Sequence, residues 1–334
     1  MAFFDMPESE LRRYRPDIAE PADFDEFWER TLRDARAAGS EPIVTQVASP
    51  FTHVRVFDVR FSGFDGHPVG AWLLLPPGEG LVPGIVQFQG YGGGRGLPHE
   101  SLAWVNAGYA TLVVDTRGQG AHRDSGSGTP DPVGSDPAVP GFMTRGIRDP
   151  ETYYYRRVFT DAVRAVDFLL TRPEIDADRV VVAGVSQGGG IALAAAGLHE
   201  SVAACLSDVP FLCHFARAVG LTESDPYAEV VRYLRAHRED GEVVARTLSY
   251  VDGVSFAARC RGAGLFSVAL HDVVCPPSTV FAAFNAYAAE LKEVVVWPFN
   301  GHEGGGADQW PRQVEFLSRV WSRESGTPRP LSGA

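Results

Sequence analysis

Ser186 has a sequence context that is typical of a catalytic nucleophile, with a glycine two positions before it and another two positions after it. Residues 184–188 read Gly-Val-Ser-Gln-Gly, with the apolar run VVVA before them and an Ala-rich run after them. A strand, a sharp turn and a helix in that order form a nucleophile elbow, in which bulkier residues at Gly184 or Gly188 would collide with backbone. We therefore predict that Ser186 is a nucleophile at the start of a helix, whose dipole adds positive potential. A serine that only caps the helix is the alternative.

A histidine late in the chain is placed to activate this serine. A serine hydroxyl is a weak nucleophile at neutral pH and needs a base within hydrogen-bond reach. His302 stands in a glycine-rich loop soon after the apolar run 293–297 and is the only histidine after His271. Where a nucleophile elbow is present, the chain order is serine, acid, histidine. This order predicts His302 as the base, and His271 is the histidine that could be mistaken for it.

The acid that orients the histidine must lie between these two residues, at the end of a strand. Asp272 stands just after the apolar run 264–270, and Asp208 follows the run 202–207. We favour Asp272, because the penultimate strand is the commoner source of the acid, and keep Asp208 as the second candidate. The role of the acid would be to hold the imidazole in one tautomer and to stabilise the imidazolium.

Two backbone N–H groups should converge on the oxyanion that forms when a carbonyl is attacked. One would belong to Gln187, the residue after the nucleophile. The other would come from the run QGYGGGRG at 89–96, which follows the apolar run 84–88. We predict that the Tyr91 N–H is this second donor.

The same glycine-rich run also permits a different function. A strand, a glycine-rich turn, a helix and a second strand ending at Asp115 is the order of a dinucleotide-binding unit. The G-x-G-x-x-G spacing fails, because Gly90 and Gly92 would require glycine at position 95, where Arg95 stands. A nicotinamide-binding oxidoreductase is therefore the alternative from another class, and a cofactor titration would distinguish it.

Short apolar runs alternate with longer helical patterns over most of the chain. This alternation predicts a mostly parallel sheet with helices on both faces, as in the α/β-hydrolase fold. The strands are expected at 84–88, 111–115, 179–184, 202–207, 264–270 and 293–297. The helices are expected at 98–107, 152–171, 187–197, 277–290 and 307–322. A turn signal at 64–66, between runs at 54–61 and 69–75, adds an antiparallel hairpin.

Three segments interrupt this alternation. Residues 7–38 are expected to form a charged helical extension, whose aromatic stripe packs on the main body or on another subunit. Residues 117–150 are rich in Gly, Pro and Asp and are expected to form a long ordered loop beside the site. Residues 210–261 are expected to form a helical insertion between two strands. Because we find no internal repeat and no low-complexity linker, we predict a single domain over residues 1–334.

Composition argues against several function classes. The chain has 334 residues, of which 45% are hydrophobic, and a formal net charge of −12. A negative net charge without a Lys/Arg run argues against nucleic-acid binding. No window reaches the roughly 18 apolar residues of a membrane-spanning helix, and the N-terminus lacks the apolar core of a signal peptide. We therefore expect a cytoplasmic protein that binds neither nucleic acid nor membrane, with four reduced cysteines and no metal site.

Three motifs carry a family likeness: RGQG at 117–120, GVSQGG at 184–189 and the pair His302-Glu303. Together with the runs at 152–166 and 275–285, they resemble the acetyl xylan esterase and cephalosporin C deacetylase family of carbohydrate esterases. RGQG is quite specific to this family. The resemblance covers nearly the whole chain.

This resemblance implies an esterase that removes acetyl groups from small acetylated sugars, short xylo-oligomers and cephalosporins, without a cofactor. It also implies a preference for short acyl groups and a ring-like homohexamer. By matching position, the triad and the two oxyanion donors are those named above. The four motif residues that would brace the elbow, rather than take part in the chemistry, are Arg117, Gly118, Gln119 and Gly120.

The pocket leaves more than one interpretation open. As a hypothesis, Tyr91, Phe211 and Pro276 crowd the acyl group and limit it to short chains. Gln89 and Val185 differ from residues frequent in the family, and either change could alter the pocket wall. The remaining alternatives are a general carboxylesterase without sugar preference, a lactonase, amidase or acyltransferase with the same triad, and a non-catalytic binding protein with this fold.

Overall fold

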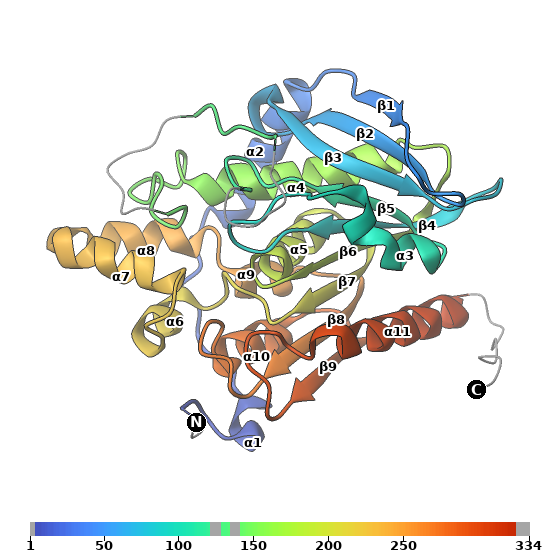
Figure 1. Cartoon of the computed structure of the whole chain (residues 1–334). Coiled ribbons are helices and arrows are strands. Elements are labelled where there is room, and N and C mark those ends of the chain that lie inside the picture. Colours follow the sequence, from blue (N-terminus) through green and yellow to red (C-terminus); the bar gives the residue numbers. More distant parts are fainter. Residues whose placement is uncertain (1–3, 121–127, 134–140, 325–334) are drawn as a thin grey trace.

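A nine-stranded sheet forms the centre of the part of the molecule that the structure describes. The computed structural model describes residues 4–120, 128–133 and 141–324. The strand order is β1-β2-β3-β5-β4-β6-β7-β8-β9 (Figure 1). The pairings from β1 through β3 to β5 are antiparallel, and those from β5 through β4 to β9 are parallel. The strands are β1 (Ile43–Val47), β2 (Arg55–Ser62), β3 (Pro68–Leu75), β4 (Val82–Phe88), β5 (Ala110–Val114), β6 (Ile175–Val185), β7 (Val202–Asp208), β8 (Ala263–Ala269) and β9 (Lys292–Trp297).

Helices cover both faces of this sheet, as predicted. On β6, Val180 and Val182 face the cluster that contains α4, α5 and α10, whereas Val181 and Ala183 face the cluster that contains α3 and α11. Side chains of a strand alternate between the two faces, so one apolar strand serves both layers. The helices are α1 (Glu8–Leu11), α2 (Phe24–Ala37), α3 (Leu102–Asn106), α4 (Tyr154–Leu170), α5 (Gln187–Leu198), α6 (Phe215–Leu221), α7 (Tyr227–Ala236), α8 (Gly241–Ser249), α9 (Gly253–Ala257), α10 (Pro277–Ala286) and α11 (Gln309–Glu324).

Most predicted elements are present, with ends shifted by a few residues, and two differences have physical reasons. β1 lies outside the predicted set because it is a largely exposed strand at the sheet edge and therefore lacks a buried apolar run. The predicted helical extension over 7–38 is helical only in part, since residues 12–23 between α1 and α2 are not helical. Pro16 and Pro21 lie in this gap, and each removes a backbone donor that a helix interior needs.

The aromatic stripe of α2 packs on the body of the same chain. Phe24 and Trp28 contact the Phe256 ring of α9 at centroid distances of 5.3 and 5.5 Å. The Trp28 indole N–H also donates to the Tyr250 carbonyl at 3.0 Å. Of the two partners that the sequence left open for this stripe, the main body is the one observed.

The predicted insertion at 210–261 carries α6 to α9, of which α6, α7 and α8 extend from the carboxyl end of the sheet (Figure 1). Of the predicted loop at 117–150, residues 121–127 and 134–140 lie outside the described residues.

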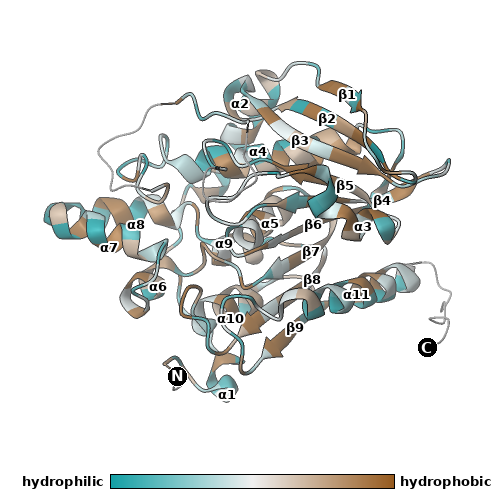
Figure 2. Ribbon diagram, viewed as in Figure 1, coloured by the Kyte–Doolittle hydropathy of each residue, from teal (hydrophilic) through white to brown (hydrophobic). Residues whose placement is uncertain are grey.

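Figure 2 shows hydrophobic residues concentrated along the central strands, while α2, α8 and α11 mix both kinds of residue. None of the helices in the described ranges combines the length and the apolar character needed to cross a bilayer.

Candidate active site

Ser186 lies in a sharp turn between β6 and α5. Its φ of 57° and ψ of −119° are unusual for a residue with a side chain, and such strain costs on the order of 1–3 kcal/mol. A Cβ added at Gly184 would lie 2.2 Å from the Gly188 carbonyl carbon, and one added at Gly188 would lie 2.4 Å from the Phe88 oxygen. Both positions therefore require glycine, as the elbow interpretation expects. The Ser186 N–H donates to the Asp208 carbonyl at 2.9 Å, which ties the turn to β7.

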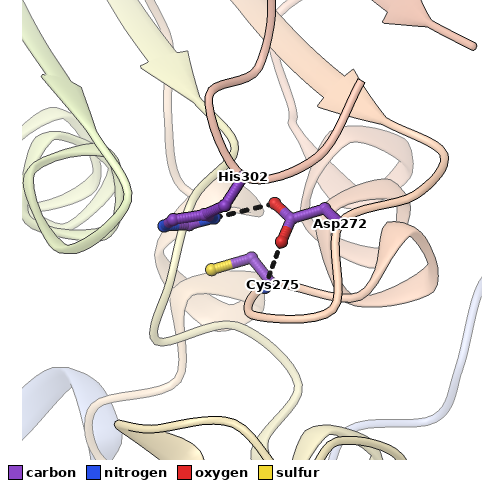
Figure 3. A group of neighbouring side chains, drawn as sticks. All are labelled: Asp272, Cys275 and His302. Carbon is purple, nitrogen blue, oxygen red and sulfur yellow. Dashed lines mark hydrogen bonds and ion pairs between the residues drawn. The ribbon is translucent and has the colours of Figure 1, made fainter. Parts of the chain in front are cut away.

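The structure brings Ser186, His302 and Asp272 into one hydrogen-bonded row. His302 Nε2 lies 2.9 Å from Ser186 Oγ, and His302 Nδ1 lies 2.8 Å from Asp272 Oδ2. Asp272 is fully buried, and its Oδ1 accepts the backbone N–H groups of Val274 and Cys275 at 2.8 and 2.9 Å. Figure 3 shows one oxygen of this carboxylate directed at the His302 ring and the other at the Cys275 backbone. A fixed carboxylate on Nδ1 leaves Nε2 free to take the proton of the serine.

Asp272, Cys275 and His302 also have the mutual spacing of metal ligands, with one candidate atom of each within 4.8 Å of the others. The relay already uses these atoms, because both oxygens of Asp272 accept hydrogen bonds and both ring nitrogens of His302 have partners. Burial raises the pKa of the Cys275 thiol well above its ordinary value. A cysteine binds a metal ion as its thiolate, and the raised pKa disfavours that form. This environment therefore suits a proton relay better than a metal ion.

Asp208, the second candidate for the acid, has a different environment. Its two oxygens accept the side-chain amides of Gln309 and Gln313 at 2.9 and 2.6 Å. Burial raises its pKa to about 7, although the amide hydrogen bonds oppose this shift. The His302 ring is paired with Asp272 instead, so geometry favours Asp272 as the orienting acid.

A buried amide network joins the loop of Tyr91 to the start of α5, where the second predicted oxyanion donor, Gln187, lies. Gln119 Oε1 accepts the Gly92 N–H at 2.6 Å, and Gln119 Nε2 donates to Gln187 Oε1 at 2.9 Å. Gln187 Nε2 in turn donates to the Gln89 carbonyl at 3.1 Å. Within the described ranges, the backbone N–H groups of Tyr91 and Gln187 have no acceptor of their own. Both are thus available to an oxyanion.

Arg117 of the RGQG run is a buried cation behind the site. Its guanidinium donates to the two oxygens of Asp161 on α4 at 2.6 and 2.7 Å, and lies 3.4 Å from Asp131. Neither Arg117 nor Gln119 lines the cavity at Ser186. Arg117 therefore contacts α4 rather than the cavity, and the bracing role expected for the motif stays a prediction.

A cavity of about 830 Å³ opens at Ser186 and His302. Tyr91 lines it, and so do Gln89 and Val185, the two positions that depart from the family pattern. Sequence reasoning missed several other lining residues, because they come from segments whose approach to Ser186 depends on the fold. These are chiefly Trp104, Asp225, Pro226, Val274, Trp310 and Gln313.

Phe211 and Pro276 correct part of the acyl-pocket hypothesis, because neither is among the described residues that line this cavity. Phe211 is fully buried, with its ring centroid 4.4 Å from that of Tyr227 and 6.2 Å from that of Tyr91. It supports Tyr91 from behind. Pro276 is buried at the start of α10.

The chain as a whole matches a known protein family. The acetyl xylan esterase (AXE1) family model matches residues 1–320. The chain belongs to the acetyl xylan esterase family. The resemblance inferred from the sequence motifs is thereby confirmed.

Solved structures of acetyl xylan esterases superpose closely on the chain. One from Paenibacillus sp. R4 is 41% identical with a TM-score of 0.87, and the match covers 93% of this chain and 99% of that one. Acetyl xylan esterase 1 from Thermoanaerobacterium sp. JW/SL YS485 is 33% identical with a TM-score of 0.88, covering 96% and 100%. This likeness, with the mostly parallel sheet, confirms the predicted α/β-hydrolase fold.

A curated relative in the acetyl esterase class is longer than this chain. Acetyl esterase Axe7A from Xylanibacter ruminicola is 27% identical over 292 residues, which are 86% of this chain. The chain spans 65% of the length of that relative, which is less than two thirds.

Proposed function

We propose that this chain is a serine esterase that removes acetyl groups from acetylated xylo-oligosaccharides, other small acetylated sugars and cephalosporin C. The observation that carries the proposal is the hydrogen-bonded row of Ser186, His302 and Asp272 at the wall of one cavity. Membership of the acetyl xylan esterase family supports acetyl as the acyl group. The same residues are proposed as the catalytic triad.

The first half of the proposed mechanism transfers the acetyl group to the enzyme. Ser186 Oγ attacks the acetyl carbonyl carbon while His302 Nε2 accepts the serine proton. Negative charge develops on the carbonyl oxygen and is stabilised by the N–H groups of Tyr91 and Gln187. The carbon–oxygen bond to the sugar then breaks, and His302 gives its proton to the departing sugar oxygen. The sugar leaves as an alcohol, and the acetyl group stays as an ester on Ser186.

The second half releases acetate. His302 takes a proton from a water molecule, and the resulting hydroxide adds to the acetyl carbonyl. The bond to Ser186 breaks, and His302 returns the proton to the serine oxygen. Asp272 keeps Nδ1 of His302 protonated throughout and stabilises the imidazolium. These steps need only the chain, the substrate and water.

A substrate panel tests this function. Purified protein and its Ser186→Ala variant should be assayed with acetylated xylose, acetylated xylobiose, cephalosporin C and p-nitrophenyl acetate, with acetate release as the readout. We expect activity on the acetylated sugars that falls by about 10⁴-fold or more in the variant. Activity on p-nitrophenyl acetate alone would instead assign a general short-chain carboxylesterase. Equal rates for the two proteins would reject a serine mechanism.

Acyl-chain length is the second property to test. We propose that Tyr91, supported by Phe211, leaves room for acetyl but not for long acyl groups beside Ser186. p-Nitrophenyl acetate should therefore be hydrolysed with a much higher kcat/KM than p-nitrophenyl octanoate. Equal efficiency on the two esters would refute the short-acyl preference.

Assembly and location complete the proposal. We expect a cytoplasmic homohexamer in which each chain is one domain. The family resemblance supports the hexamer, and the four buried free thiols of Cys205, Cys213, Cys260 and Cys275 support a reducing compartment. Light scattering measures the oligomeric state, and cell fractionation measures the location. A single unfolding transition would support one domain per chain. A monomer at micromolar concentration would refute the hexamer.

A further inference from the structure

The cavity at Ser186 is lined in part by residues of α3 and of the start of α11. These two helices pack on the same face of the sheet (Figure 1). Trp104 of α3 and Trp310 of α11 line this part of the cavity, with ring centroids 5.7 Å apart in an edge-to-face arrangement. Ala183 of β6 lines the same cavity and has a small side chain. We call this part, with its lining residues Trp104, Ala183, Asp208, Gln309, Trp310 and Gln313, the tryptophan crevice.

A polar group lies beside the two tryptophans. Asp208, Gln309 and Gln313 line the crevice and are only 5%, 3% and 7% exposed. The two amides donate to the two oxygens of Asp208 at 2.9 and 2.6 Å. A carboxylate offers about four acceptor positions. The Asp208 side chain can therefore accept further hydrogen bonds from a ligand at this wall.

Buried polar atoms without partners gather at the same cavity. In the described part of the chain, eight buried side-chain polar atoms have no hydrogen-bond partner, and three belong to cavity-lining residues. They are Gln87 Oε1, Gln89 Nε2 and Trp310 Nε1. Leaving such an atom unpaired costs about 1–3 kcal/mol, so folded proteins normally pair these groups. A ligand rich in hydroxyl groups could pair both the acceptor and the donors after small side-chain movements.

The charge of the cavity restricts the ligand further. Four acidic side chains line it, from Glu100, Asp208, Asp225 and Glu303, of which Asp208 has a pKa raised to about 7 by burial, and none of its described lining residues is lysine or arginine. An anion would be repelled here, and an apolar chain would leave the polar wall unpaired. A neutral, hydroxylated ring with an apolar face fits both the tryptophans and the amides.

We propose that the tryptophan crevice is the subsite for the sugar part of the substrate, where the saccharide rests while its acetyl group lies at Ser186. This inference rests on the proposed function and adds which residues select a saccharide as the alcohol that leaves. Sugar C–H groups pack on Trp310, and sugar hydroxyls bond to the Asp208–Gln313 wall. The subsite therefore increases kcat/KM for saccharide esters and has little effect on kcat/KM for a small aryl ester.

Two variants and a matched control test the subsite. Trp310→Phe shortens the aromatic wall, and Gln313→Met removes the amide while keeping the length of the side chain. Trp321→Phe is the control, because Trp321 is on the same helix and in the same apolar cluster but does not line the cavity. The readouts are kcat/KM for acetylated xylobiose and for p-nitrophenyl acetate, and the Ki of xylobiose against the aryl ester.

Each subsite variant should lower kcat/KM for acetylated xylobiose and raise the Ki of xylobiose by about fivefold, the effect of one lost hydrogen bond or ring contact. kcat/KM for p-nitrophenyl acetate and all values of Trp321→Phe should stay within about twofold of wild type. Equal losses on both substrates, or an unchanged Ki in both variants, would overturn the subsite. If wild type hydrolyses neither ester, the proposed function fails by itself. In that case, xylobiose is titrated into Ser186→Ala and into the double variant Ser186→Ala, Trp310→Phe, with tryptophan fluorescence as the readout. Weaker binding by the double variant would support the subsite, and equal binding would reject it.

Discussion

The Tyr91 hydroxyl donates to both carboxylate oxygens of Glu229, at 2.8 and 2.9 Å, across 138 residues of chain. The Phe142 N–H donates to the same hydroxyl at 2.6 Å, and the Met143 N–H donates to Glu229 at 3.1 Å. Glu229 belongs to the first turn of α7, so the helical insertion is tied directly to the loop that carries a proposed oxyanion donor. We expect this contact to let the insertion hold the Tyr91 loop in place, in addition to lining the cavity with Asp225 and Pro226.

Tyr91→Phe tests that role, because phenylalanine keeps the backbone N–H and removes only the hydroxyl, with its hydrogen bonds to Glu229 and Phe142. We expect kcat for p-nitrophenyl acetate to fall by about tenfold with little change in KM, since an oxyanion donor acts mainly in the transition state. Glu229→Leu, which removes the acceptor of the Tyr91 hydroxyl, should have a similar effect. The double variant should be no worse than the more affected single variant, because both changes remove one shared contact. Losses that multiply in the double variant would show that the two residues act independently.

The choice between the two candidate acids can be tested with a matched pair of variants. Asp272→Asn should lower kcat by about 10⁴-fold, because the amide cannot hold the reactive tautomer of His302. Asp208→Asn changes the same chemical group at the end of the neighbouring strand β7 but lies outside the row formed by Asp272, His302 and Ser186. The kcat of Asp208→Asn for p-nitrophenyl acetate should stay within about tenfold of the wild-type value. The reverse ranking would make Asp208 the acid.

Asp208 should also make stability depend on pH. Burial raises its pKa to about 7 from an ordinary value of 3.8. Between these two values the folded state binds a proton that the unfolded state has released, so the free energy of unfolding falls as pH rises. The stabilising contribution of Asp208 protonation is fully present below about pH 4 and is lost as pH rises through about 7. Over this range the free energy of unfolding falls with a slope approaching about 1.4 kcal/mol per pH unit.

Urea unfolding of wild type and Asp208→Asn at several pH values between 4 and 8 measures this contribution. Other carboxyl groups titrate in both proteins, so the difference between the two curves isolates Asp208. We expect the variant to lose less stability than wild type over this range. Parallel curves would show that Asp208 has a similar pKa in the folded and unfolded states.

The triad positions could be predicted because each follows an apolar strand and because chain order alone separates serine, acid and base. The cavity wall could not be predicted in the same way. Trp104, Pro226 and Trp310 come from a short helix, the insertion and the last helix, and nothing local to their sequences marks an approach to Ser186. Phe211, which the acyl-pocket hypothesis puts in the wall, lies one layer behind Tyr91. Spacing thus predicts residues at strand ends better than residues brought in by long connections.

The acidic lining of the cavity predicts discrimination between neutral and anionic acetyl esters. Cephalosporin C carries a net negative charge near neutral pH, and the carboxylates of Glu100, Asp225 and Glu303 line the cavity. We expect acetylated xylobiose to have the higher kcat/KM at low ionic strength. The ratio of the two values should shrink by about twofold to threefold as salt rises from 10 to 300 mM, because salt screens exposed charges over about 6 Å at the higher concentration. Asp225→Asn should reduce the salt effect. A ratio independent of salt in wild type would mean that charge does not select the substrate.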